Sequence, residues 1–269
     1  MAALESPMNI ARQTTKYEEK GFSREKAEIN ALMENAILAI FQDFPDAFLL
    51  FGGAALVLFH ESVRHSADLD LLPLGTSIPT RDEIISTLKA EVSPIAETLQ
   101  LGELQFATTG SGGVEGSIFV SSSSGQRLFR VDLTKLGSAI ESEIETHPIE
   151  SQSGESVDIK SPTKELLLLQ KAEAFLLRRI VKARDAYDIH VLLQKGAALN
   201  PNLKAHLEDA IHANEIDGEI ISERIAQIDI DRCSLELKPI LPPEIYTPLE
   251  EREFGKLRDA VKKLFEEWL

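Results

Sequence analysis

The spacing of apolar residues predicts helices in the first part of the chain. From about Thr14 to Phe44, apolar side chains recur at intervals of three and four residues: Ile29, Leu32, Met33, Ala36, Ile37 and Ile40. This spacing places them on one stripe of a helix. Thr80, followed three residues later by Glu83, forms a capping box that predicts a second helix running to about Leu99.

Short runs of strand-forming residues, separated by turn residues, predict a sheet. The expected strands cover about residues 47–51, 68–72, 103–108, 116–121, 127–133 and 155–159. A glycine turn and a short apolar helix ending near Ser62 connect the first two. The segment Ser122-Ser123-Ser124-Gly125 predicts a hairpin between the strands on either side of it.

Beyond Ser161-Pro162-Thr163 the pattern becomes helical, with expected helices at about 166–181 and 185–193. Pro239, Pro242, Pro243 and Pro248 predict a non-helical connector before a last helix over about 249–269. The fold class is therefore α+β. We expect an N-terminal helical extension (1–45), an α/β core (46–160) and a helical C-terminal domain (161–269).

The charge and the cysteine content of the 269 residues exclude some kinds of binding and some kinds of site. A formal net charge of −16 argues against broad, non-specific binding of nucleic acid. A local basic segment, Arg178-Arg179 with Lys182 and Arg184, leaves two alternatives open: it grips an RNA end, or it holds the polyphosphate of a nucleotide. The single cysteine, Cys233, excludes an internal disulfide and a cysteine-rich zinc site.

The N-terminal residues and the hydropathy of the chain predict a cytoplasmic protein that does not enter a membrane. No apolar run approaches the roughly 20 residues that a membrane-spanning helix needs. The first seven residues contain neither a basic nor an apolar region of the kind found in secretory leaders.

Two acidic residues are expected on one face of the strand near residues 68–72. Side chains at positions i and i+2 of a strand share a face, so Asp68 and Asp70 point to the same side. Their repulsion gives folding no advantage unless a cation lies between them, and carboxylate oxygens suit Mg²⁺ that also contacts substrate phosphates. Upstream, Gly52-Gly53 can bring backbone N–H groups and a helix N-terminus close to a phosphate. These residues predict a site for a metal-bound nucleoside triphosphate.

A third carboxylate, Asp132, lies between the strand-forming residues Val131 and Leu133. If its strand lies beside the Asp68–Asp70 strand, three carboxylates converge, as in two-metal nucleotidyl transfer. The alternative is that Asp132 is a solvated residue near a strand end.

A second charged cluster lies in the helical part. Lys171, Arg178 and Asp185 recur at seven-residue spacing, so an unbroken helix would place them near one face, with Asp188 close by. In one interpretation Lys171 contacts triphosphate oxygens as a compact charge. In the other it forms a structural salt bridge with an acid such as Glu173 or Asp188.

The residues around both clusters resemble a known family. The segment Phe51-Gly52-Gly53-Ala54-Ala55-Leu56, followed by Arg64-His65-Ser66-Ala67-Asp68-Leu69-Asp70, resembles the first motif of the DNA-polymerase-β-type nucleotidyltransferases. More narrowly, it resembles the AbiEii/AbiGii toxin branch. The later residues Lys171, Arg178 and Arg184-Asp185-Ala186-Tyr187-Asp188 match that branch in order and at about the right distance.

The resemblance implies a mixed β-sheet with helices and a Mg²⁺-dependent transfer of a nucleotidyl group from a nucleoside triphosphate. It also implies an RNA acceptor (the 3′ end of a transfer RNA in some members) or a protein acceptor, and a role as a toxin with a cognate antitoxin.

The resemblance further implies a role for each matching residue. The implied metal ligands are Asp68, Asp70 and Asp132, and the implied nucleotide-binding residues are Gly52, Gly53, Ser66, Lys171 and Arg178. Asp185 and Asp188 complete the implied site. One departure concerns Ala54, which stands where the branch commonly has Thr or Ser, so a hydroxyl contact to the triphosphate is lost. Ser66 either replaces that contact or is a turn residue that hydrogen-bonds the backbone.

Two other functions fit the same sequence. The acidic charge and the missing hydroxyl also suit a nucleotide-binding regulatory protein without turnover. The charged C-terminal helices also suit a protein whose main role is to bind an antitoxin.

Overall fold

The computed structural model describes residues 6–74, 78–110, 115–134, 141–151 and 154–269. The chain divides into two compact units. The sheet unit comprises Met1–Phe59 and His65–Pro162, and the helical unit comprises His60–Arg64 and Thr163–Leu269. The segment 60–64 therefore belongs to the helical unit, although the residues on both sides of it belong to the sheet unit.

A five-stranded mixed sheet forms the centre of the sheet unit, with the strand order β1-β2-β5-β4-β3. Only β2 and β5 run parallel; the other neighbours are antiparallel. A separate two-stranded sheet pairs β6 with β7. The strands are β1 (Phe48–Phe51), β2 (Asp68–Pro73), β3 (Leu104–Thr109), β4 (Gly116–Ser122), β5 (Arg127–Leu133), β6 (Ile144–Glu150) and β7 (Ser156–Pro162).

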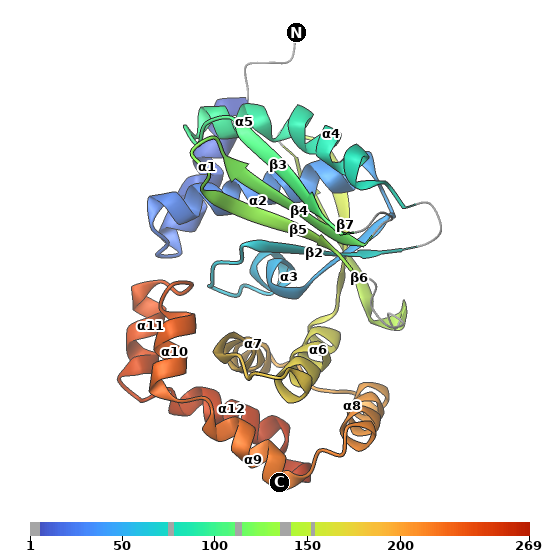
Figure 1. The fold of residues 1–269 in the computed structure, drawn as a ribbon, viewed down its shortest axis with the longest axis vertical. Helices are drawn as coiled ribbons and strands as arrows, with labels where there is room; N and C mark the ends of the chain where they lie inside the picture. Colours follow the sequence, from blue (N-terminus) through green and yellow to red (C-terminus); the bar gives the residue numbers. More distant parts are fainter. Residues whose placement is uncertain (1–5, 75–77, 111–114, 135–140, 152–153) are drawn as a thin grey trace. The chain divides into compact units, whose positions relative to one another are not determined.

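Three helices of the sheet unit, α2, α4 and α5, cover one face of this sheet, as Figure 1 shows. Alternate residues of β2 and β5, namely Leu69, Leu71, Val131 and Leu133, are almost fully buried. The other residues of these strands, which include the acidic ones, face the opposite side. The helices are α1 (Ser6–Glu19), α2 (Arg24–Asp43), α3 (Gly52–Phe59), α4 (Arg81–Glu91) and α5 (Ser93–Thr98), with a 3₁₀ turn at Glu141–Glu143.

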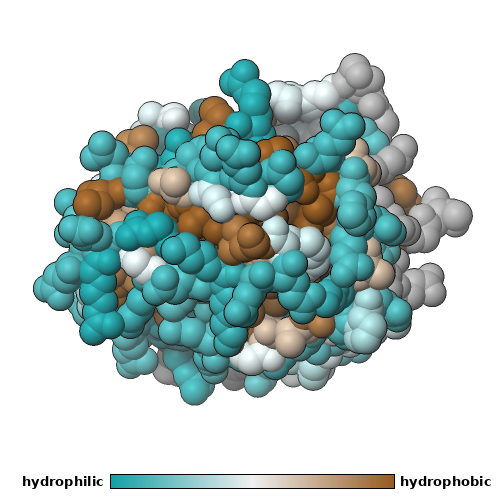
Figure 2. Space-filling model, turned by 90° about the horizontal axis from the view of Figure 1, so that it is seen from below, coloured by the Kyte–Doolittle hydropathy of each residue, from teal (hydrophilic) through white to brown (hydrophobic). Residues whose placement is uncertain are grey.

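The helical unit packs its helices around aromatic residues, and Phe175, Phe254 and Phe265 are fully buried. The exposed large apolar residues of the described chain all belong to this unit: Leu177, Ile180, Ile230, Leu235 and Leu269. Figure 2 shows hydrophobic residues at the surface, set among hydrophilic ones. The helices are α6 (Lys164–Leu177), α7 (Ala183–Gln194), α8 (Pro201–Ala213), α9 (Gly218–Ala226), α10 (Ile230–Leu237), α11 (Pro243–Glu250) and α12 (Gly255–Leu264), followed by a 3₁₀ turn at Glu266–Trp268.

Three helices predicted as continuous are broken. The first divides into α1 and α2 around Gly21, whose φ of 86° is outside the helical range. The helix that begins at the Thr80 capping box ends at Glu91, and α5 starts anew with Pro94 in its first turn. The predicted last helix begins only at Gly255, because Phe254 adopts a left-handed conformation with φ of 58°.

The proline-rich connector prediction was wrong, because α11 spans Pro243–Glu250. Pro243 occupies the first turn of this helix, where a missing backbone N–H costs no hydrogen bond. The strand β6 was not predicted, since it contains Pro148 and is mostly polar. A two-stranded sheet tolerates such a sequence because neither strand is central. Within the described ranges, no helix is both long and apolar enough to cross a membrane.

Candidate functional site

The acidic face of the five-stranded sheet is the first candidate site. Asp68 and Asp70 are half-exposed on β2, while Leu69 between them is fully buried. The predicted alternation of side chains along this strand is confirmed.

Asp132 lies beside these two carboxylates. Because β5 runs parallel to β2, Asp132 is the direct neighbour of Asp70, and Arg130 is the neighbour of Asp68. Ser117 on β4 is the neighbour of Asp132 on the other side, and its hydroxyl donates a 2.5 Å hydrogen bond to Asp132 Oδ1. The strand pairing therefore gathers all three acids on one face of the sheet, as the sequence analysis expected for adjacent strands.

Arg130 joins two of the three acids, a role that the sequence analysis did not assign to it. Its Nη2 lies 2.7 Å from Asp132 Oδ2 and 3.3 Å from Asp68 Oδ1. The i, i+2 spacing of Arg130 and Asp132 was visible in the sequence, but the contact with Asp68 depends on the strand order.

Gly52 shapes the same face from the start of α3. Its φ is 69°, and a Cβ atom built on it would lie only 2.2 Å from Asp70 Oδ2. No side chain fits between this backbone and the carboxylate, so Gly52 allows β1 to turn into α3 directly beside Asp70. Gly53, which follows it, is buried in the first turn of α3.

Ser66 is buried, and its hydroxyl donates a long hydrogen bond of 3.4 Å to the carbonyl of Asp68. It also lines a small cavity together with Ala54 of α3 and Asn30 of α2. The structure thus places Ser66 in the turn before β2.

The donor set of Asp68 and Asp70 fits a divalent magnesium ion, since carboxylate oxygens are the ligands that Mg²⁺ prefers. The backbone of Gly52 lies close to the carboxylate of Asp70. Across the described residues, however, no group of three or more His, Cys, Asp or Glu side chains is arranged to hold one metal ion. Both oxygens of Asp132 already accept hydrogen bonds or ion pairs, from Ser117 and Arg130.

The second predicted cluster lies inside the helical unit and is centred on Asp188, which is fully buried. Arg64 binds it with two nitrogens, Nε at 2.6 Å and Nη2 at 3.0 Å. Lys171 Nζ lies 2.8 Å from the same carboxylate. Burial alone would raise the pKa of Asp188, but the attraction of Arg64 and Lys171 holds it below its ordinary value.

Asp185, one turn earlier on α7, is also fully buried but has weaker partners. Arg178 Nη1 lies 2.8 Å from its Oδ2, whereas Lys171 Nζ is 3.8 Å from its Oδ1, which accepts no hydrogen bond. Burial raises the pKa of Asp185, and Lys171 and Arg178 oppose this shift. The two buried acids of α7 therefore differ in how readily they bind a proton.

The contacts among Lys171, Arg178 and Asp185 do not arise from an unbroken helix. Helix α6 ends at Leu177 and α7 begins at Ala183. The side chains meet because α6 and α7 pack against each other as neighbouring helices. The salt-bridge interpretation of Lys171 with Asp188 is confirmed by the 2.8 Å contact. The interpretation as a triphosphate ligand stays a prediction.

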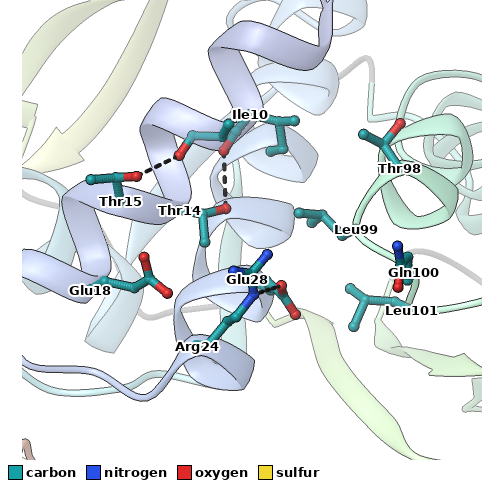
Figure 3. A pocket seen from close by; sticks show the side chains of 11 residues that line it. Ile10, Thr14, Thr15, Glu18, Arg24, Glu28, Thr98, Leu99, Gln100 and Leu101 are labelled. Atoms are coloured by element: carbon teal, nitrogen blue, oxygen red, sulfur yellow. Dashed lines mark hydrogen bonds and ion pairs between the residues drawn. The ribbon is translucent and has the colours of Figure 1, made fainter.

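A pocket of about 640 Å³ elsewhere in the sheet unit contains none of the predicted residues. Figure 3 shows it between α1, the start of α2, and the end of α5 with the segment after it; Thr14, Glu28 and Gln100 are among its lining residues. Arg24 and Glu28, which both line this pocket, form an ion pair with a distance of 2.9 Å. This pocket is therefore separate from the acidic face.

The family model described as "Nucleotidyl transferase AbiEii toxin, Type IV TA system" matches residues 36–266. No curated protein matches the chain.

Two solved structures from Helicobacter pylori share the fold. One, a candidate nucleotidyltransferase, is 17% identical with a TM-score of 0.57, and the match covers 91% of this chain and 99% of the other. The second, JHP933, is 16% identical with a TM-score of 0.54, and the match covers 91% and 96%. The mixed α+β fold that the sequence analysis expected is confirmed.

Proposed function

Because the chain belongs to the AbiEii family of nucleotidyltransferase toxins, we propose that it transfers a nucleoside monophosphate from a nucleoside triphosphate to an acceptor hydroxyl. The observation that carries this proposal is the acidic face, where Asp68 and Asp70 point to one side of β2 with the Gly52 backbone against Asp70. In this proposal the physiological role is that of a toxin with a cognate antitoxin.

Asp68 and Asp70 would hold Mg²⁺ at this face. When bound, the ion would neutralise negative charge on the triphosphate oxygens and so make the phosphorus under attack more electrophilic. Gly52 and Gly53 let the backbone at the start of α3 approach the phosphates, as helix N-termini do for anions. Asp132 is the third carboxylate of the proposed site.

The covalent step joins the acceptor oxygen to the α-phosphorus. The bond from that phosphorus to the oxygen of the β-phosphate breaks, and pyrophosphate leaves with the bonding electron pair. The hydroxyl proton is released to water. Positioning and electrostatic stabilisation by the protein then supply most of the rate.

The roles in the helical unit rest on the family resemblance. Lys171 and Arg178 are proposed to neutralise triphosphate charge, and Asp185 and Asp188 are proposed to hold these cations in place. The 2.8 Å contacts of Lys171 with Asp188 and of Arg178 with Asp185 support the second part.

The acceptor class is tested by incubating the protein and Mg²⁺ with each labelled triphosphate in turn, in the presence of total RNA or of total protein. The proposal expects one or more labelled products, absent in the Asp68→Asn variant. An RNA product, including a transfer RNA labelled at its 3′ end, and a protein product identify two different acceptors.

A second candidate function, nucleotide binding without turnover, is favoured by two observations. Ala54 provides no hydroxyl at the start of α3, and Arg130 occupies oxygens of Asp68 and Asp132. Binding of a triphosphate with Mg²⁺, combined with no labelled RNA or protein, would support this candidate against the transferase.

A further inference from the structure

Arg130 lies between the carboxylates of Asp68 and Asp132. In a two-metal site, a second divalent ion would use these carboxylates as ligands. Arg130 lies on β5 beside Asp68 of β2 and two residues before Asp132 of its own strand. One nitrogen, Nη2, approaches both acids, at 3.3 Å and 2.7 Å. This guanidinium therefore bridges the two strands on the acidic face.

The bridge is partly shielded from water, which strengthens it compared with an ion pair at the surface. The side chain of Arg130 is 32% exposed, and that of Asp132 only 14%. The Nε atom of Arg130 is buried and has no hydrogen-bond partner. The contacts of Nη2 with two carboxylates place the positive charge of Arg130 on the acidic face.

Both oxygens of Asp132 already have a partner while this bridge is in place. Its Oδ1 accepts the hydrogen bond of Ser117, and its Oδ2 faces Arg130. A divalent ion on Asp132 would compete with these partners for the same oxygens, and an ion beside Arg130 would meet a like charge within a few ångströms. On Asp68, Arg130 Nη2 lies 3.3 Å from Oδ1.

We propose that Arg130 takes the place of the second metal ion, so that the site binds one divalent ion, on Asp68 and Asp70, and keeps Asp132 as the partner of Arg130. This inference rests on the proposed function and refines it. A guanidinium there offers the transferring phosphoryl group the positive charge that the second ion provides in two-metal enzymes.

The test counts Mn²⁺ ions bound to the full-length protein by electron paramagnetic resonance, with no nucleotide present. An acidic chain also binds Mn²⁺ weakly elsewhere, so only ions lost on substitution of a named carboxylate are counted. The wild type is expected to bind one ion that Asp68→Asn removes, and none that Asp132→Asn removes. Arg130→Met and Arg130→Gln are each expected to gain a second ion, which adding Asp132→Asn removes again.

Two controls separate this role from a general effect of charge or folding. Arg130→Lys keeps a cation and is expected to bind one ion. Arg127→Met removes a cation from the same strand, where Arg127 stacks on Phe119, and is also expected to leave one ion. Circular dichroism confirms that each variant is folded.

The other outcomes separate the inference from the function it rests on. A wild-type protein that already binds an ion dependent on Asp132, or folded Arg130→Met and Arg130→Gln variants that gain none, would overturn the inference and leave the proposed transferase standing. A wild-type protein with no ion dependent on Asp68 or Asp70 would overturn both.

Discussion

At the scale of single residues, the position of the Asp70 carboxylate depends on the glycine at position 52. The left-handed φ of Gly52 lets the chain turn from β1 into α3, and its missing side chain leaves room for the carboxylate of Asp70. Glycine adopts such a conformation without the steric penalty that other residues have.

Gly52→Ala is therefore expected to reduce nucleotidyl transfer strongly, because its Cβ would push Asp70 out of place. Gly125 provides the matched control, since its φ is 84° and a Cβ atom added there would meet nothing within 4 Å. Both alanine variants are expected to lose about 1–2 kcal/mol of stability in chemical denaturation, from the left-handed conformation alone. Only Gly52→Ala should lose activity. Equal activity in the two variants would show that the position of Asp70 is unimportant.

Asp70 and Asp68 are expected to be essential for transfer. Asn has nearly the same shape but no charge, so Asp68→Asn and Asp70→Asn should each lower kcat/KM at least about 10²–10³-fold, the usual effect of removing one preorganised electrostatic group. Asp158→Asn is the control, since Asp158 is an exposed acid on strand β7 of the same unit. Transfer of label in the proposed assay measures all three. Wild-type rates in the first two variants would refute the proposed site.

At the scale of elements, helices α6 and α7 bury the charged residues Lys171, Asp185 and Asp188, of which Asp188 is the best partnered. Removing one partner of a buried ion pair leaves the other charges without compensation. Asp188→Asn should therefore destabilise the protein by about 3–5 kcal/mol at neutral pH. Its fully buried contacts with Arg64 and Lys171 supply the reason.

The two acids of α7, Asp185 and Asp188, should change the free energy of unfolding with pH in opposite directions. The pKa of Asp188 is lowered on folding, so its contribution is complete above its ordinary value of 3.8 and is lost as pH falls through the folded pKa. The pKa of Asp185 is raised, so the folded state binds its proton more tightly than the unfolded state. Its ionised form costs stability at neutral pH, and this cost disappears as pH falls toward 3.8.

Urea denaturation at several pH values checks both signs. Relative to Asp185→Asn, the wild type should gain stability as pH falls from neutral toward 3.8. Relative to Asp188→Asn, the wild type should keep its advantage over that range and lose it only below. Parallel pH profiles for the two variants would contradict the assignment.

The elements also show what the sequence could and could not predict. The alternation of Asp68 and Asp70 with buried leucines follows from the geometry of any strand, so it needed no tertiary information. The bridge from Arg130 to Asp68 depends on β2 pairing with β5, which no local pattern encodes. The contact of Lys171 with Asp185 likewise comes from two packed helices, although the spacing suggested one continuous helix.

At the scale of the whole molecule, the net charge of −16 restricts how an RNA acceptor could bind. Most of the surface would repel a polyanion, so contact must concentrate on local cations. In the segment 178–184, Arg178 and Lys182 already pair with Asp185 and Glu236. Arg179 and Arg184 are exposed and form no ion pair among the described residues, which leaves them available to phosphates.

If the acceptor is RNA, replacing both Arg179 and Arg184 with alanine should weaken its binding and reduce its dependence on salt. Each phosphate contact to a single strand contributes about 0.7 to the slope of log affinity against log salt, so losing two contacts should reduce the slope by about 1.4. The control replaces Lys262 and Lys263, two exposed cations at the end of α12, and changes the net charge equally. Filter binding of labelled RNA over a series of salt concentrations gives the slopes. Both double variants carry the same total charge, so a difference in slope between them reports the position of the contact. Equal slopes would place the RNA contact elsewhere. A reduced slope in the arginine variant alone would locate the contact beside the turn from α6 to α7.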